Sequence, residues 1–312
     1  MSETTITRAH YGLLVIASVV TYLLIVMGGV VCMTGSGLGC PDWPMCYGQI
    51  IPPVNMGAII ETTHRFLAVL TLPLIVAAAV MGWRKQRSIW WLSRPPVIAV
   101  ALVLAVVVFG AFAVLTGLPP ILAAIDVGCA LMVLALVLTT AVVARARRNV
   151  PGVSDRLTFR TPFARLALGA LAAAFLVLVS GPLAAGVGSL ARCVGWPLYG
   201  AVVGAAETAG AVPLVRRALG VAAAVLIVAV VLQAWRLHRK SSAVLRCATA
   251  LAIALLTEAM VGALMPAHGF TMLYGVLYSA AAAGVWALLV VLAVLAATTR
   301  GISEPRRPVG GG

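Results

Sequence analysis

The chain has 312 residues, of which 62% are hydrophobic and only 10% are charged, and its mean hydropathy is +1.10. A water-soluble domain needs more polar surface than this, so the composition excludes a soluble globular protein. The formal charge of +14 at pH 7 would suit a nucleic-acid-binding protein, but the positions of the basic residues indicate another origin.

Eight stretches reach the roughly 20 mostly apolar residues that a membrane-spanning helix needs. In chain order they cover about 11–33, 59–83, 97–118, 121–144, 163–187, 211–235, 243–265 and 271–298. The sequence therefore predicts an all-α membrane protein with eight transmembrane helices, arranged as two pseudo-symmetric four-helix bundles.

The basic residues follow the loops between these spans. Of 22 Lys and Arg residues, 18 lie before span 1, after span 8 or between alternate spans. The opposite side carries only Arg65, Arg192, Arg216 and Arg217. The positive-inside rule then predicts that both termini are cytoplasmic. We expect the basic loops to attract anionic lipid rather than nucleic acid.

The loop after span 1, at about 34–58, carries Cys40 and Cys46 around the turn-forming Asp42-Trp43-Pro44. An extracytoplasmic compartment permits disulfides, and the turn would bring the two sulfurs together. Three interpretations are open: a structural disulfide, a redox-active pair that exchanges with a thiol-disulfide oxidoreductase, or two unpaired thiols.

The other cysteines are expected to be unbonded. Cys32, Cys129 and Cys247 fall within predicted spans and resemble small buried packing residues. Cys193 lies outside the spans with no cysteine near it in the sequence.

A polar cluster, Glu61-Thr62-Thr63-His64-Arg65, opens span 2. Glu61 and His64 are three residues apart and share one helix face. A neutral imidazole is a good haem-iron ligand, and a nearby carboxylate can orient a ligand or move a proton. The alternative is a polar group that anchors the helix end in the lipid headgroups.

The longest basic connection, at 149–162, divides the chain into a first half at 1–148 and a second half at 163–312. The halves resemble a diverged repeat with ordered matches: Gly35-Ser36 with Gly188-Ser189, Cys40 with Cys193, and Trp43-Pro44 with Trp196-Pro197. Four spans return the chain to its starting side, so the repeat is predicted to be parallel.

These motifs resemble the haem A synthase family, eight-span enzymes of terminal-oxidase haem maturation. The resemblance rests on GSGLGCPDWPMCYG from Gly35, on ETTHR from Glu61, and on the segment Ala113–Pro120 that ends in TGLPP. It implies oxidation of the C8 methyl of haem O to a formyl group, by successive hydroxylations. It also implies that Glu61 is catalytic, that His64 ligates haem iron, and that Cys40 and Cys46 are the loop cysteines of the family.

The family pattern has four histidine ligands, on spans 2, 4, 6 and 8, two for each half. Only His64 is retained. The other positions fall on Asp126, on Arg216 or Arg217, and near Tyr278 or Ser279. His10, His238 and His268 lie elsewhere.

The replacements have different chemistry from histidine. Asp126 could relay a proton, Arg216 and Arg217 could pair with haem propionates, and Tyr278 is either a phenolate ligand or a packing residue. Arg65 is a further candidate for haem binding. The ligands of a haem b cofactor in the second half are therefore not evident.

Three functions remain open. The first is an oxidoreductase of the haem A synthase type with haem O as substrate, in a plasma membrane shared with haem O synthase and oxidase assembly factors. The second is a non-catalytic haem-binding or oxidase-assembly paralogue that has lost the second haem site. The third is a small-molecule transporter, which the parallel repeat alone would allow.

Overall fold

The computed structural model describes residues 6–149, 157–184, 193, 211–268 and 271–298. Within them the chain is helical, without a β-strand, and eight helices are long and apolar enough to cross a membrane. They are α1 (Arg8–Met33), α2 (Met56–Lys85), α3 (Trp90–Leu115), α4 (Pro120–Asn149), α5 (Pro162–Ala184), α7 (Ala211–Leu237), α8 (Ser242–His268) and α9 (Met272–Thr298). The prediction of an all-α, eight-span protein is confirmed.

The largest difference from the predicted spans is at α3, which begins at Trp90 rather than near residue 97. Pro95 and Pro96 lie inside the helix, and membrane helices tolerate prolines whose freed backbone groups find other partners. The helix also ends earlier, at Leu115. Gly117 and Leu118 follow with φ of 79° and 60° and form the tight turn that precedes α4.

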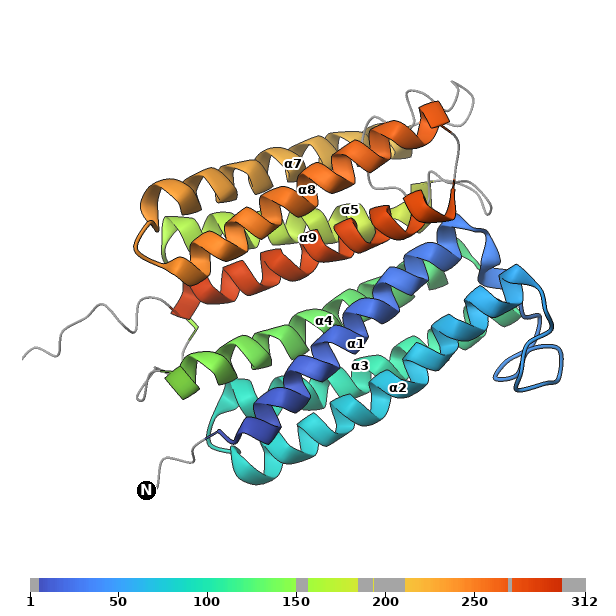
Figure 1. The fold of residues 1–312 in the computed structure, drawn as a ribbon, viewed down its shortest axis with the longest axis horizontal. Helices are drawn as coiled ribbons and strands as arrows, with labels where there is room; N and C mark the ends of the chain where they lie inside the picture. Colours follow the sequence, from blue (N-terminus) through green and yellow to red (C-terminus); the bar gives the residue numbers. More distant parts are fainter. Residues whose placement is uncertain (1–5, 150–156, 185–192, 194–210, 269–270, 299–312) are drawn as a thin grey trace, which may run out of the picture.

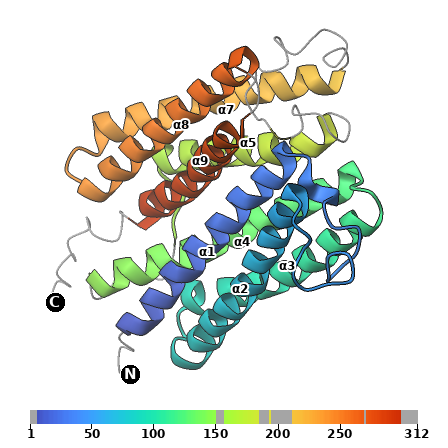
Figure 2. The same ribbon diagram turned by 45° about the vertical axis from the view of Figure 1, so that its right-hand side comes forward.

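Each half is a four-helix bundle whose helices meet their neighbours in the same order (Figures 1 and 2). In the first half α1 packs on α2, α2 on α3, α3 on α4, and α4 back on α1. The second half repeats this order with α5, α7, α8 and α9. The halves meet where α1 and α4 face α9, and where α4 faces α5. The internal repeat itself stays a prediction.

Helix α9 forms the wall between the halves. In its most apolar segment 61% of the residues are buried, against 39% or less in each other span. Two hydrogen bonds join it to the first half: the Tyr22 hydroxyl donates to the Ala280 carbonyl at 2.8 Å, and the Trp286 indole N–H donates to the Leu131 carbonyl at 3.0 Å. Such bonds satisfy groups that lipid could not.

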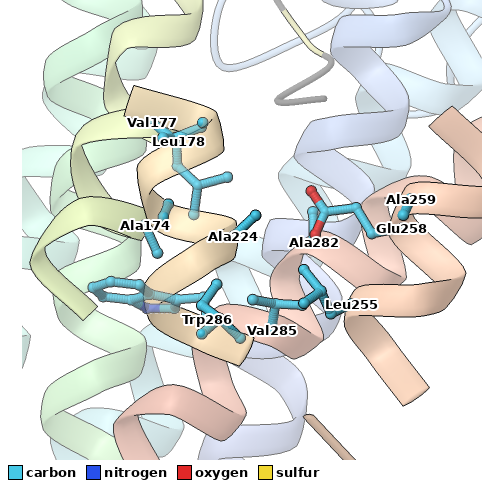
Figure 3. A pocket seen from close by; sticks show the side chains of 13 residues that line it. Ala174, Val177, Leu178, Ala224, Leu255, Glu258, Ala259, Ala282, Val285 and Trp286 are labelled. Atoms are coloured by element: carbon cyan, nitrogen blue, oxygen red, sulfur yellow. The ribbon is translucent and has the colours of Figure 1, made fainter. Parts of the chain in front are cut away.

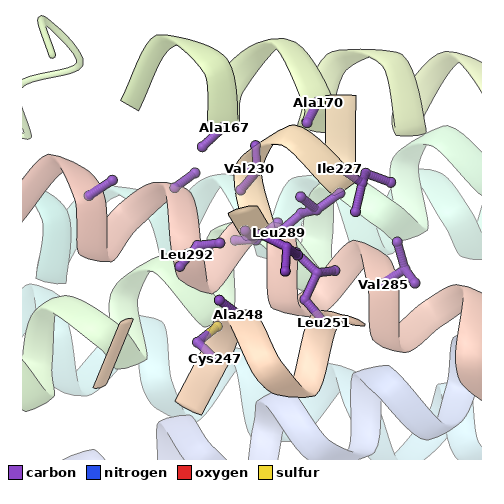
Figure 4. Packing of buried hydrophobic residues seen from close by; sticks show 14 of the residues in the cluster. Ala167, Ala170, Ile227, Val230, Cys247, Ala248, Leu251, Val285, Leu289 and Leu292 are labelled. Carbon is purple, nitrogen blue, oxygen red and sulfur yellow. The ribbon is translucent and has the colours of Figure 1, made fainter. Parts of the chain in front are cut away.

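The second half has the largest apolar core of the molecule. Leu289 of α9 packs between Leu251 of α8 and Val230 of α7, and Ala167 and Ala170 of α5 close the cluster (Figure 4). Small side chains let helices approach closely in a membrane, where van der Waals contact drives their association. The second half is therefore a close-packed bundle.

Two disulfides lie at one end of the bundle, which we call the disulfide end. One joins Cys40 to Cys46, which agrees with a structural disulfide and with a redox-active pair, and not with two unpaired thiols. The other joins Cys32, at the end of α1, to Cys193, which precedes α7. The prediction that Cys32 and Cys193 are unbonded is wrong, because the fold brings together two cysteines that are 161 positions apart.

The Cys32–Cys193 bond predicts that the two halves stay joined after the linker is cut. With a protease site inserted into the 149–162 linker, we expect cut protein to run as one band on a non-reducing gel and as two after reduction. A membrane-impermeant reductant added to intact spheroplasts should suffice, if the disulfide end faces outward. Separation of the halves without reductant would contradict the bond. The control is Cys32→Ser, which lacks the bond and should give two bands without reductant.

Candidate functional site

Arg65 of α2 attaches the Cys40–Cys46 loop to the head of the helix. Its guanidinium donates to the carbonyl oxygens of Asp42 at 2.8 Å, Met45 at 2.7 Å and Cys40 at 3.5 Å. It also forms an ion pair with Glu61. We call this set of contacts the Arg65 clamp. Since these contacts involve both guanidinium Nη atoms, Arg65 is placed against the loop and not toward the interior of the first half.

Glu61 is buried, with 3% of its surface exposed, and both of its carboxylate oxygens have partners. Oε1 accepts from Arg65, and Oε2 accepts the Cys40 backbone N–H at 2.8 Å. A buried carboxylate needs such compensation, because burial of an unpaired charge is costly. Glu61 is thus inside the protein at the base of the loop, and the alternative of an anchor in the headgroups does not fit its burial.

Asp42 holds the tip of the same loop. Its carboxylate oxygens accept the backbone N–H groups of Gly48 at 2.7 Å and Tyr47 at 2.6 Å. The bond from Gly48 contributes most to holding the pKa of Asp42 below its usual value. A lowered folded-state pKa stabilises the turn above the unfolded pKa of about 3.9, and this contribution is lost as the pH falls through the folded value. The turn is therefore intact at neutral pH.

His64 lies about two turns into α2 and faces α1. Its Cε1 lies 3.2 Å from the place that a Cβ atom of Gly28 would occupy. Its Nδ1 is shielded from solvent and makes no hydrogen bond of standard geometry within the described residues, although the backbone of Leu24 lies near the ring. Glycine at position 28 thus leaves room for the imidazole, and a lone pair or N–H of the ring is available to a ligand.

Asp126 lies on α4, against α3. One of its oxygens, Oδ1, is buried without a hydrogen-bond partner in the described part of the chain. This atom lies 3.6 Å from the Cβ position of Gly110 on α3. His64 faces α1 and Asp126 faces α3, so the two side chains line different helix pairs of the first half.

In the second half the structure brings Tyr278 to a residue that sequence reasoning missed. The Tyr278 hydroxyl donates to Glu258 Oε1 of α8 at 3.2 Å, and Arg216 and Arg217 lie near the start of α7. The signal for Glu258 was a single carboxylate in the middle of an apolar span, since ionisable groups in such positions are functional by default. Ser279 points the other way, against Gly29 of α1.

Two hollows lie near these groups. A cleft of about 380 Å³ opens at the disulfide end, beside the base of the Cys40–Cys46 loop; its lining comes from Thr34, Gly35, Ser36, Leu38, Gly39, Met56, Gly57, Ile60 and Met272. The second half holds a cavity of about 50 Å³, with the Glu258 carboxyl and the Trp286 indole at opposite sides (Figure 3). The larger hollow thus borders the first half.

The remaining histidines lie away from both hollows. His10 is fully buried near the start of α1, His238 packs on Phe163 with ring centroids 4.4 Å apart, and His268 is the last residue of α8. Among the described residues no group of three His, Cys, Asp or Glu side chains could hold a metal ion. Of the histidines described, His64 is the one that lies next to the loop motif.

A family model described as cytochrome oxidase assembly protein, COX15-CtaA, matches residues 11–290. The chain belongs to this family. It is 33% identical over 132 residues to a Heme A synthase of Bacillus licheniformis, and this aligned region covers 42% of this chain and 44% of that protein. It is 28% identical over 190 residues to a Heme A synthase of Alkalihalophilus pseudofirmus, and this aligned region covers 59% of this chain and 62% of that protein. The matches thus span about two fifths to three fifths of these relatives.

The Arg65 clamp predicts that loss of the guanidinium exposes the loop disulfide, whose cysteines are now 0% and 2% exposed. In Arg65→Met we expect Cys40–Cys46 to be reduced at least about tenfold faster, because the loss of a single charged hydrogen bond is worth about 1.5–3 kcal/mol and about 1.4 kcal/mol is tenfold. Timed phosphine treatment followed by maleimide labelling measures the rate. Arg94→Met, at the opposite end of the bundle, is the control, and equal rates in all three proteins would refute the clamp.

Proposed function

We propose that this protein is an oxidoreductase of the haem A synthase type, which converts haem O to haem A for terminal oxidases. The observation that carries the proposal is the group at the head of α2. A buried carboxylate, Glu61, and a partly shielded imidazole, His64, lie one helical turn apart under a disulfide-bonded loop. The match of the family model over residues 11–290 supports it.

The substrate haem would occupy the first half at the disulfide end. His64 is the proposed axial ligand, because its Nδ1 side has no partner among the described residues and a neutral imidazole binds haem iron. The cleft of about 380 Å³ beside the loop is the proposed entrance. A porphyrin with a farnesyl tail suits a site whose walls are apolar helices.

The proposed reaction oxidises the C8 methyl group of haem O in two hydroxylations. Each consumes one dioxygen, two electrons and two protons, inserts one oxygen atom into a C–H bond and releases one water. The resulting geminal diol loses a third water and leaves the formyl group. Dioxygen is the proposed oxidant, and an external donor supplies the electrons.

Glu61 has two separable roles in this proposal. Through its bonds to Arg65 and Cys40 it fixes the loop over the site. As a carboxylate near the reacting carbon it would also accept a proton or stabilise positive charge that develops on the porphyrin, which general acid–base groups do with about 10²- to 10⁴-fold effect.

A second candidate is a non-catalytic haem-binding or oxidase-assembly paralogue. The sequence feature in its favour is that none of the residues aligned with the other three ligand positions is a histidine. They are Asp126, Arg216 or Arg217, and Tyr278 or Ser279. If the wild type, supplied with haem O and a competent reductant, makes no haem A, this candidate replaces the first.

The setting we propose is a plasma membrane with both termini cytoplasmic and the disulfide end outside. The 18 basic residues on the cytoplasmic side and the two disulfides on the other support this orientation. Haem O synthase and oxidase assembly factors are the proposed neighbours, and a thiol-disulfide oxidoreductase would act on the loop.

The roles of Glu61 are separated by comparing Glu61→Gln with Arg65→Gln. Both break the ion pair, and Arg65→Gln also removes three contacts to loop carbonyls. If Glu61 acts in the chemistry, we expect Glu61→Gln to bind haem but to make at least about a hundredfold less haem A, while Arg65→Gln keeps more activity. Chromatography of extracted haems measures the product. Equal losses would reduce Glu61 to a residue of the clamp.

Gly28 provides a graded test of His64. A methyl group at position 28 would press on the imidazole at 3.2 Å, whereas Gly12 of the same helix has no neighbour within 4 Å. We expect Gly28→Ala to shift the absorbance of the bound haem and weaken its binding, Gly12→Ala to leave both unchanged, and His64→Ala to abolish binding. Gly12→Ala also controls for the higher helix propensity of alanine. An unaltered spectrum in His64→Ala would remove His64 as the ligand.

A further inference from the structure

A second haem in this fold would need two things in the second half. The first is a pair of axial ligands on α7 and α9, where the family pattern has histidines. The second is space, because cavities for ligands of drug size or larger occupy about 300 Å³ or more. Both requirements can be compared with the described residues.

In the alignment with the family pattern, the two ligand positions fall on Arg216 of α7 and Tyr278 of α9. Neither is a histidine. Arg216 carries a guanidinium, which stays protonated and has no lone pair to donate to iron.

The Tyr278 phenol is already engaged. Its side chain is 1% exposed and its hydroxyl donates to Glu258 at 3.2 Å. A buried carboxyl group in an apolar bundle is costly without a hydrogen-bond partner, so this contact stabilises Glu258 as much as it holds the tyrosine. The neighbouring residue offers no alternative, because Ser279 is directed at Gly29 on the far side of α9.

The space beside Glu258 is also too small. The cavity measures about 50 Å³, which corresponds to one or two water molecules at about 30 Å³ each. Around it pack Ala174, Val177, Ile227, Val285 and Trp286, several of which belong to the close-packed core of the second half.

We infer that the described helices of the second half, α5, α7, α8 and α9, hold no haem between them, and that the hydrogen-bonded pair of Glu258 and Tyr278, with a small cavity beside Glu258, takes the place of a haem ligand pair. The pair joins α8 to α9 where a cofactor would separate them. For the proposed oxidation, on which this consequence rests, electrons then reach the first half from an external donor without a resident haem as relay.

The inference is tested by titrating purified full-length protein with haem and counting bound haem per chain by pyridine haemochrome. The expected result is a single site that is lost in His64→Ala and retained, with an unchanged spectrum, in Tyr278→Phe and Glu258→Gln. These two variants keep the size of the native side chains, so each should fold, and thermal unfolding of the detergent-solubilised protein verifies it.

The outcomes separate this inference from the proposed function. Two sites per chain, or one site that disappears in Tyr278→Phe or Glu258→Gln but not in His64→Ala, would overturn the inference. No site in the wild type would agree with the inference for the second half and would contradict the proposed function.

Discussion

The ion pair and hydrogen bond that stabilise the buried carboxylate of Glu61 also fix the loop at the disulfide end of the molecule. Glu61 sits at the head of a membrane helix with 3% of its surface exposed, where an uncompensated charge would destabilise the fold by several kcal/mol. The sequence supplies a guanidinium one turn later on α2 and a backbone N–H from Cys40. Because Arg65 must stay near Glu61, its remaining donors fall on the carbonyls of the loop, and the loop is held in place by the same charge that it helps to neutralise.

The two halves meet the demands of a membrane interior in different ways. The first half leaves polar atoms of His64 and Asp126 without partners among the described residues, and the second half leaves such atoms at Arg217 and Gln233. The second half pairs Tyr278 with Glu258 and fills the surrounding space with apolar side chains. Two four-helix bundles with the same order of helix contacts therefore differ in how they accommodate their buried polar side chains.

Apolar runs of about 20 residues were sufficient to predict eight spans, because the bilayer fixes helix length. Sequence spacing was less informative about contacts. Glu61 shares a helix face with both His64 and Arg65, and the structure pairs it with Arg65 at i, i+4. Spacing alone does not decide between the two, since the decision depends on which neighbour also reaches the loop.

The remaining errors arose from contacts between segments distant in sequence. Cys32 reads as a packing residue within a span, and its partner Cys193 belongs to the other half. Glu258 lies in an apolar stretch with no motif around it, so its charge was its one signal in the sequence, and its partner Tyr278 becomes evident only when α9 packs beside α8.

The Cys32–Cys193 bond also bears on how the chain matures. Synthesis proceeds from the N-terminus, so Cys32, Cys40 and Cys46 are made long before Cys193, which follows Cys32 by 161 positions. During that interval three thiols lie within fifteen residues of sequence, and only the small Cys40–Cys46 ring can close correctly. The thiol of Cys32 has to remain unpaired until Cys193 has been synthesised and has reached the disulfide end. Closure of the second bond then makes the association of the two halves covalent.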